Sequence, residues 1–84
     1  MTFTNPISGV TYAQHDDAAL AAALTAAGWH PASCDIGQHV LVSFSNTWEG
    51  WGTVIKHYKN GAVRVRYDDG HGGNPRRYQI WVQG

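Results

Sequence analysis

The sequence predicts a mainly β protein in which one N-terminal helix precedes a small, strongly bent antiparallel β-barrel. Asn60 and Gly61 lie between two alternating, β-branched runs, which is a strong signal for a hairpin. Four such runs follow one another after Gly37, joined mostly by short loops. Because the chain has 84 residues, it has room for one compact domain.

We expect residues 1–36 to form an arm and a helix, and residues 37–84 to form the barrel. Pro6 and Gly9 interrupt the segment from Met1 to Tyr12, so this segment is expected to be an extended arm with one short strand. An arm of this kind would complete the edge of the barrel sheet. The two parts together make a single compact domain.

The run from Ala18 to Ala27 predicts a helix. Two aspartates precede it, where they complement the helix dipole, and alanine has the highest helix propensity. Gly28 suits the position after the last turn. Leu20 and Leu24 give the helix a thin apolar stripe, with Trp29 as an anchor beyond its end. The sequence leaves open whether this stripe packs on the barrel or on a partner.

Alternating side chains predict the first two barrel strands. The run Gln38–Phe44 alternates, with Val40, Val42 and Phe44 on one face. Gly50 and Gly52 bracket Trp51, a spacing that indicates a bulge or a close backbone approach where the second strand starts. That strand then continues to the Asn-Gly turn.

The third strand follows a turn that we expect to be type I′, with positive φ at both Asn60 and Gly61. Its apolar face holds Val63, Val65 and Tyr67, and its polar face holds Arg64, Arg66 and Asp68. A loop with three glycines, Asp69–Pro75, comes next. The last strand is expected from about Arg77 to Val82.

The formal charge of zero hides an asymmetry along the chain. Residues 1–50 carry four acidic side chains and no Lys or Arg, whereas residues 51–84 carry six Lys and Arg against two Asp. Four arginines form the one plausible anion-binding or partner-binding surface: Arg64, Arg66, Arg76 and Arg77. Interleaved with aromatic residues, they would suit single-stranded nucleic acid or an acidic protein. A solvated face that protects the sheet edge is the favoured interpretation, because the charge excess falls short of a nucleic-acid footprint.

Residue types disfavour several kinds of chemistry. The single cysteine, Cys34, cannot form an internal disulfide or a four-ligand zinc site, and we expect a buried or linker thiol rather than a nucleophile. Asp68, Asp69 and His71 match no calcium loop and fit ordinary turn chemistry, so no metal or cofactor is expected.

No apolar run approaches the roughly 20 residues that cross a bilayer, and no secretory signal pattern opens the chain. We therefore expect a soluble, cytoplasmic protein.

Motifs in the second half resemble the Tudor-like branch of SH3-like barrels. They are Gly37-x-x-Val40, Trp48-x-Gly50, Gly61-x-Val63-x-Val65-x-Tyr67-Asp68-Asp69-Gly70 and Tyr78-x-Ile80. In that family an open aromatic cage beside an acidic residue reads methylated lysine or arginine, by cation–π attraction. The resemblance implies a ligand site made of Trp48 or Trp51, Tyr58, Tyr67 and Asp69. The alternative is that these aromatic side chains pack in or around the core.

A second resemblance is to the plasmid-borne type B dihydrofolate reductases, which assemble as tetramers around one pore. Gln79-Ile80-Trp81 stands where that family has a Gln-Ile-Tyr triple that lines the pore and holds the pterin and the nicotinamide. Tyr78 replaces a small apolar residue, and Val42 stands where the family has a lysine. Without that lysine, the positive charge that would attract the anionic substrate and cofactor is missing.

We expect a non-enzymatic, monomeric binding module that holds a protein or peptide through an exposed aromatic cluster with flanking arginines. An oligomeric reductase that uses NADPH and a nucleic-acid-binding barrel are the alternatives. The reductase would need a symmetric assembly, and the nucleic-acid binder would show an affinity that falls steeply with salt. The sequence does not decide whether its four tryptophans are core or surface residues.

Overall fold

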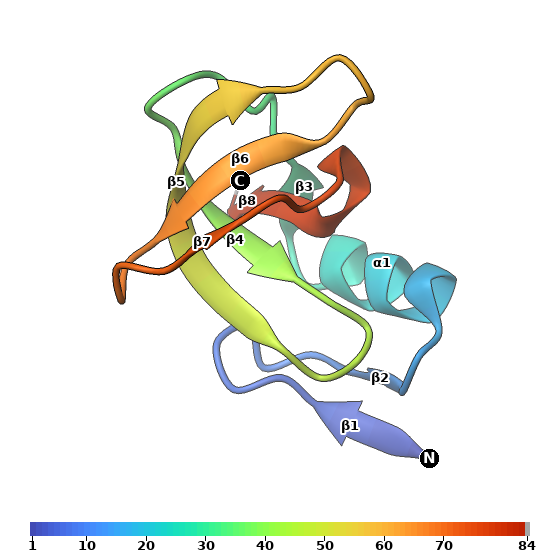
Figure 1. Cartoon of the computed structure of the whole chain (residues 1–84). Helices are drawn as coiled ribbons and strands as arrows, with labels where there is room; N and C mark the ends of the chain where they lie inside the picture. The colour runs from blue at the N-terminus through green and yellow to red at the C-terminus, as the bar shows by residue number, and fades with distance from the viewer. Residues whose placement is uncertain (84) are drawn as a thin grey trace.

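The computed structural model describes residues 1–83, in which eight strands, one α-helix and one 3-10 helix follow one another (Figure 1). Gly84, the last residue of the predicted barrel range, lies outside this part. The first elements are β1 (Thr2–Thr4), β2 (Thr11–Ala13), α1 (Asp17–Ala26) and β3 (Trp29–Pro31). The remaining elements are β4 (His39–Ser43), β5 (Glu49–His57), β6 (Val63–Tyr67), β7 (Gly72–Gly73), η1 (Arg77–Gln79) and β8 (Ile80–Gln83).

The strands form two antiparallel sheets. β1 and β2 pair with each other, and the other six strands form one sheet in the order β3-β8-β4-β5-β6-β7. In Figure 1, α1 lies to one side of the large sheet and the hairpin of β1 and β2 lies at the bottom of the view. Neither sheet closes on itself within residues 1–83. The mainly β class with one helix is therefore confirmed, whereas closure into a barrel is not shown.

The predicted helix is confirmed with a shift of one residue. Its body runs over Asp17–Ala26 rather than Ala18–Ala27, and the carboxylate of Asp16 accepts the Ala19 N–H at 3.0 Å. This bond satisfies one of the free donors at the start of the helix. The chain leaves the helix through Gly28 at φ 95°, a left-handed conformation that glycine adopts without a steric cost.

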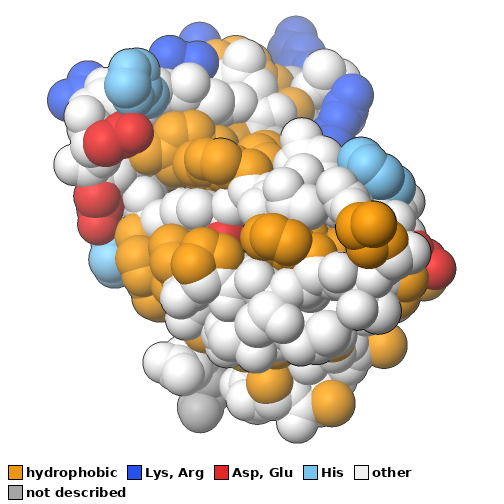
Figure 2. All heavy atoms as spheres, turned by 90° about the horizontal axis from the view of Figure 1, so that it is seen from below, with side chains coloured by type: hydrophobic (Ala, Val, Ile, Leu, Met, Phe, Trp, Pro, Cys, Tyr) orange, Lys and Arg blue, Asp and Glu red, His pale blue; other side chains and the backbone are white. Residues whose placement is uncertain are grey.

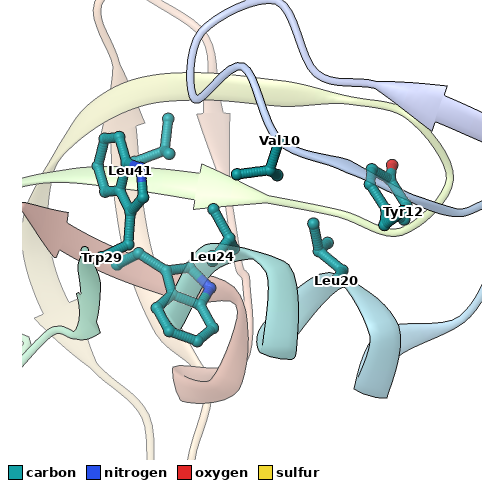
Figure 3. Close-up of a cluster of buried hydrophobic side chains, with 7 residues drawn as sticks. Val10, Tyr12, Leu20, Leu24, Trp29 and Leu41 are labelled. Carbon is teal, nitrogen blue, oxygen red and sulfur yellow. The ribbon is translucent and has the colours of Figure 1, made fainter. Parts of the chain in front are cut away.

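The helix packs on the large sheet through a first hydrophobic cluster (Figure 3). The cluster contains seven buried side chains: Val10, Tyr12, Leu20, Leu24, Trp29, Leu41 and Trp81. Leu20 and Leu24 come from α1. Leu41 comes from β4, in the middle of the sheet, and Tyr12 comes from β2. The thin apolar stripe of the helix is therefore covered within its own chain.

A second hydrophobic cluster involves the opposite face of the central strand. It contains Cys34, Val40, Val42, Val54, Val63, Val65 and Ile80. Side chains along β4 alternate between the two clusters, because Val40 and Val42 join the second and Leu41 joins the first. On β6 the predicted alternation is confirmed, since Val65 is buried and Arg66 is exposed. A strand that is covered on both faces needs the nearly continuous apolar run found in β4.

The prediction that the N-terminal arm completes the edge of the large sheet is wrong. The arm folds back on itself, with Phe3 opposite Tyr12 in the small hairpin. The edge position beside β8 is taken by β3, which ends at Pro31. Burial of Trp29 in the first cluster holds this short segment against β8.

The predicted hairpin between β5 and β6 is confirmed, but its turn is not type I′. Gly61 has φ 87°, whereas Asn60 does not have a positive φ. The Gly61 N–H donates to the Tyr58 carbonyl, and the Tyr58 N–H donates to the Ala62 carbonyl. This is the pattern of a three-residue loop with a glycine bulge. The side chain of Asn60 supports the loop by accepting the Ala62 N–H at 3.1 Å.

The close backbone approach predicted near the start of β5 is found at Gly52. A Cβ at this position would lie 2.4 Å from Cγ1 of Val65 and 2.8 Å from the carbonyl oxygen of Arg66. The irregularity in the strand pairing lies further along, between Val54 and Lys56. Such a bulge increases the local twist and bends the long strand.

The last strand is shorter than predicted. Residues Arg77–Gln79 form the 3-10 helix η1, so β8 begins only at Ile80. The side chain of Gln79 accepts the Arg76 N–H at 2.9 Å, and the Gln79 N–H donates to the Arg76 carbonyl at 2.9 Å. These two bonds close a tight turn that an alternating sequence pattern does not reveal.

Candidate functional site

A groove of about 260 Å³ opens between the start of β5 and the turn that follows β6, and we call it the aromatic groove. It is lined by Trp48, Glu49, Gly50, Trp51, Tyr67, Asp68 and Asp69. Four of the five residues predicted for a ligand site therefore lie together: Trp48, Trp51, Tyr67 and Asp69. Figure 2 shows a face on which hydrophobic side chains are exposed in bands, with acidic and histidine side chains at both its left and right margins.

Trp48 forms one wall of the aromatic groove. A Cβ on Gly50 would lie 2.5 Å from the Trp48 indole, so the missing side chain lets the indole lie directly over the strand. The ring centre of Tyr67 lies 4.8 Å from that of Trp48, in an edge-on arrangement. Phe44 packs against the same indole at 5.5 Å. Trp48 is still 40% exposed, which leaves ring surface free for a ligand.

Tyr67 is the second aromatic wall. Gly73 supports it closely, because a Cβ there would lie 2.6 Å from the phenol oxygen. Burial raises the pKa of Tyr67, against a smaller opposing effect of Arg64. The phenol therefore stays neutral at physiological pH, and the ring presents an uncharged π surface to the groove.

Trp51 connects the aromatic groove to the first hydrophobic cluster. Its indole stacks on the His39 ring, with centroids 5.1 Å apart, and lies 5.7 Å from the Trp29 indole. The four tryptophans therefore divide into two pairs. Trp29 and Trp81 are buried in the first cluster, whereas Trp48 and Trp51 line the groove.

Two aspartates after β6 give the groove an acidic rim, and each lies next to a histidine. Asp68 Oδ2 is 3.2 Å from His39 Nε2, and Asp69 Oδ2 is 3.0 Å from His71 Nδ1. Asp69 also accepts the backbone N–H of His71 at 2.9 Å. The hydrogen bond between the two side chains lowers the pKa of Asp69 and raises the pKa of His71. Asp69 is therefore ionised throughout the physiological range.

Glu49 is a buried carboxylate whose role the sequence did not indicate. It accepts N–H groups from Ile7 at 3.1 Å and Ser8 at 2.7 Å, and the side-chain amide of Asn5 at 2.9 Å. The hydroxyls of Ser8 and Ser43 donate to it as well. None of the ion pairs of residues 1–83 includes Glu49, so neutral donors compensate for its burial. Except for Ser43, its partners lie some 40 positions away, beyond the reach of any local pattern.

Tyr58, the fifth predicted ligand residue, lies outside the aromatic groove. It follows the far end of β5, roughly 20 Å along the strand from Trp51 at the usual rise per residue. Its ring is 37% exposed and lies under Lys56, whose Nζ is 5.3 Å from the ring centre. Tyr58 therefore offers a matched aromatic control that does not belong to the groove.

The predicted anion surface does not overlap with the groove lining. Its members are Arg64, Arg66, Arg76 and Arg77. Arg64 donates to the side-chain oxygen of Asn74 at 3.2 Å, and Arg76 donates to the carbonyl of Asn60 at 2.9 Å. Two of the four guanidinium groups thus stabilise loops of their own chain.

The three residues of the alternative pore lie in different environments. Ile80 is buried in the second cluster and Trp81 in the first, whereas Gln79 is half-buried in η1. Gln79 and Trp81 border a depression of about 10 Å³, which has room for about one water molecule.

Cys34 is buried in the second cluster, which confirms the predicted buried thiol. Burial is also the main reason that the pKa of its thiol is raised. Its backbone carbonyl, rather than its thiol, is hydrogen-bonded to Nε2 of His57. Because the thiolate is the nucleophilic form, this environment disfavours reactivity.

Comparisons of the chain with protein-family models, with curated proteins and with solved structures give no match. In residues 1–83, no helix has the length and apolar character needed to span a bilayer.

Proposed function

We propose that this protein is a non-enzymatic interaction module of the Tudor-like kind, whose aromatic groove holds a methylated lysine or arginine side chain of a peptide or protein. One observation carries the proposal, the convergence of aromatic and acidic side chains around a single opening. Trp48 directly precedes β5 and Trp51 lies near its start, whereas Tyr67 ends β6 and Asp69 lies in the turn that follows. The whole hairpin separates these positions in the sequence, so they meet only in the folded chain.

The chemistry of the aromatic groove suits a large, weakly hydrated cation. An ammonium over an indole or phenol face gains about 0.5–2 kcal/mol, with tryptophan the best partner. The carboxylates of Asp68 and Asp69 add attraction at the rim. The same carboxylates would repel an anionic ligand, since no arginine lines the groove.

The strand arrangement supports an SH3-like barrel as the scaffold. β4 lies between β8 and β5, and the bulge between Val54 and Lys56 lets β5 bend. A one-turn helix leads into the last strand. A small sheet of this order, filled by the second hydrophobic cluster, is what we expect of such a barrel.

The contacts of the other candidate residues favour peptide binding over the two alternatives. A reductase pore would need Ile80 and Trp81 at a surface, yet they are 0% and 5% exposed in the single chain. Nucleic-acid binding would need free guanidinium groups, yet Arg64 and Arg76 already hold neighbouring loops. The aromatic groove is complete within one chain, which fits a monomer.

Calorimetric titration with two capped peptides tests the proposal. One peptide carries trimethyllysine, and the other carries the isosteric neutral side chain in which carbon replaces the ammonium nitrogen. We expect the neutral peptide to bind at least about tenfold more weakly, because it loses the cation–π and carboxylate attraction. In the Trp48→Ala variant the affinity for trimethyllysine should fall by a similar factor.

The Tyr58→Ala variant is the matched control, since this exposed ring lies outside the aromatic groove. Its affinity for the trimethyllysine peptide should stay within about twofold of the original. Equal affinity for the charged and neutral peptides, or equal losses in both variants, would contradict the proposed function.

A further inference from the structure

The start of β5 has a free edge beside the aromatic groove. On one side, Glu49, Gly50 and Trp51 pair with β4. On the other side, pairing with β6 begins only at Gly52, which lies opposite Tyr67. Figure 1 shows the first half of β5 extending below the point where β6 ends. The chain turns away there, because the Gly70 N–H donates to the Tyr67 carbonyl at 2.9 Å.

The backbone groups of this edge point toward the aromatic groove. In an antiparallel strand, the N–H and C=O of one residue point to one side and those of the next residue to the other. The Trp51 carbonyl accepts the Asp68 N–H at 2.9 Å, so the backbone groups of Trp51 and Glu49 are directed toward the side of β6. The Phe44 N–H donates to the Trp48 carbonyl, so Phe44 and Trp48 form a hydrogen-bonded pair. The next pair, Ser43 and Glu49, is therefore not hydrogen-bonded, and the backbone groups of Glu49 point away from β4.

Three of these backbone groups are unused. In the hydrogen bonding of residues 1–83, neither the N–H nor the C=O of Glu49 has a backbone partner, and the Trp51 N–H has none. Proteins usually protect such an edge, because it can pair with another chain. Here the five donors that hold the Glu49 side chain fix the edge in an extended conformation.

We infer that the partner peptide binds by adding a short antiparallel strand to the edge at Glu49 and Gly50, beyond Asp68, as a continuation of β6. This inference rests on the proposed function, because the groove that receives the cation also lies along this edge. The occupant is an extended segment of a partner protein that carries a methylated lysine. The negative charge of Asp68 and Asp69 at the rim complements that cation.

The register follows from the pairing of β6. Since Tyr67 lies opposite Gly52, the peptide residue opposite Gly50 shares a face with Tyr67. The Trp48 indole lies over this same face of Gly50. The methylated lysine therefore belongs opposite Gly50, and the residue after it exchanges two backbone hydrogen bonds with Glu49.

Amide-to-ester replacement in a capped trimethyllysine pentapeptide tests the register. An ester at the residue after the lysine removes the N–H that would donate to the Glu49 carbonyl, and we expect the affinity to fall about three- to tenfold. An ester at the lysine itself is the matched control, because that N–H points away from β5. The control should stay within about twofold of the parent peptide.

The capped single amino acid, N-acetyl-trimethyllysine methyl ester, separates this inference from the proposed function, because it has neither the N–H nor the C=O of the following residue. We expect it to bind more weakly than the pentapeptide, because it lacks the residue that pairs with Glu49. Equal affinity of the two esters, or of the single amino acid and the pentapeptide, would overturn strand addition and leave the cation site intact. If neither the amino acid nor the pentapeptide binds, the proposed function itself fails, and this inference with it.

Discussion

Glu49 shows how much one residue can organise in a chain of this size. Its backbone forms the edge of the aromatic groove, while its carboxylate fastens the N-terminal arm to β5. Asn5, which donates to it, is 1% exposed, and its Oδ1 has no hydrogen-bond partner among the described residues. The attachment of the N-terminal arm to β5 therefore depends on a carboxylate, which accepts hydrogen bonds at both of its oxygens.

We expect Glu49→Gln to lower the free energy of unfolding by about 1–3 kcal/mol. The new amide group would turn its own donors toward those of Asn5, Ser8 or Ser43, which leaves buried donors without acceptors. Urea unfolding followed by tryptophan fluorescence measures the change. Asp35→Asn, at an exposed position, should change the stability by less than about 0.5 kcal/mol. Equal effects of the two variants would contradict a buried, fully used carboxylate.

Asp69 and His71 give the rim a dependence on pH. The pKa of Asp69 is lowered, so its contribution to stability is present above its ordinary value and lost as pH falls through the lowered one. The pKa of His71 is raised, so its contribution is present below its ordinary value and lost as pH rises through the raised one. The pair thus stabilises the turn most between roughly pH 4 and pH 6.5.

An NMR titration of the histidine rings tests this pairing. Asp69→Asn should bring the pKa of His71 down toward its ordinary value, because the neutral amide cannot stabilise the imidazolium. Asp68→Asn is the control, since Asp68 pairs with His39 instead. If the proposed function holds, affinity for the trimethyllysine peptide should rise as His71 loses its proton. An unchanged His71 titration in Asp69→Asn would refute the pairing.

At the scale of elements, α1 depends on tertiary packing. An isolated ten-residue helix is marginal in water, and only Leu20 and Leu24 of this helix are buried. We expect Leu24→Ala to cost about 2–5 kcal/mol, which would unfold much of so small a domain. Circular dichroism during thermal unfolding measures this loss. Thr25→Ala, on the exposed side, should have an effect within about 0.5 kcal/mol, and a similar loss in both variants would contradict the packing described.

The elements that could be predicted from the sequence are those with a local signal. The helix has its cap and alanine run, and β4 and β6 have their alternation. β3 and β7 could not be predicted, because three residues and two glycines carry no periodicity and are strands only through their pairing with β8 and β6. The aromatic residues of the groove could be predicted from the motifs around the hairpin. Tyr58 was misplaced with them, since a motif does not tell which end of a long strand a residue occupies.

The whole molecule is a sheet with a different layer on each face. Its radius of gyration is 12.0 Å, close to the roughly 12 Å expected of a compact chain of this length. The helix and the N-terminal arm cover one face of β4, and the second cluster lies on the other. The aromatic groove lies where β6 turns away from β5, so backbone groups without partners, aromatic rings and carboxylates lie together at one place.

Chemical-shift mapping with the trimethyllysine peptide tests the central claim most directly, because it locates the ligand on the intact chain. We expect the largest changes at the indole N–H groups of Trp48 and Trp51 and at the backbone amides of Glu49 and Asp69. The amide of Tyr58 should stay unchanged. Changes centred on the arginines of β6 or on η1, or no changes at all, would contradict the assignment of the aromatic groove as the binding site.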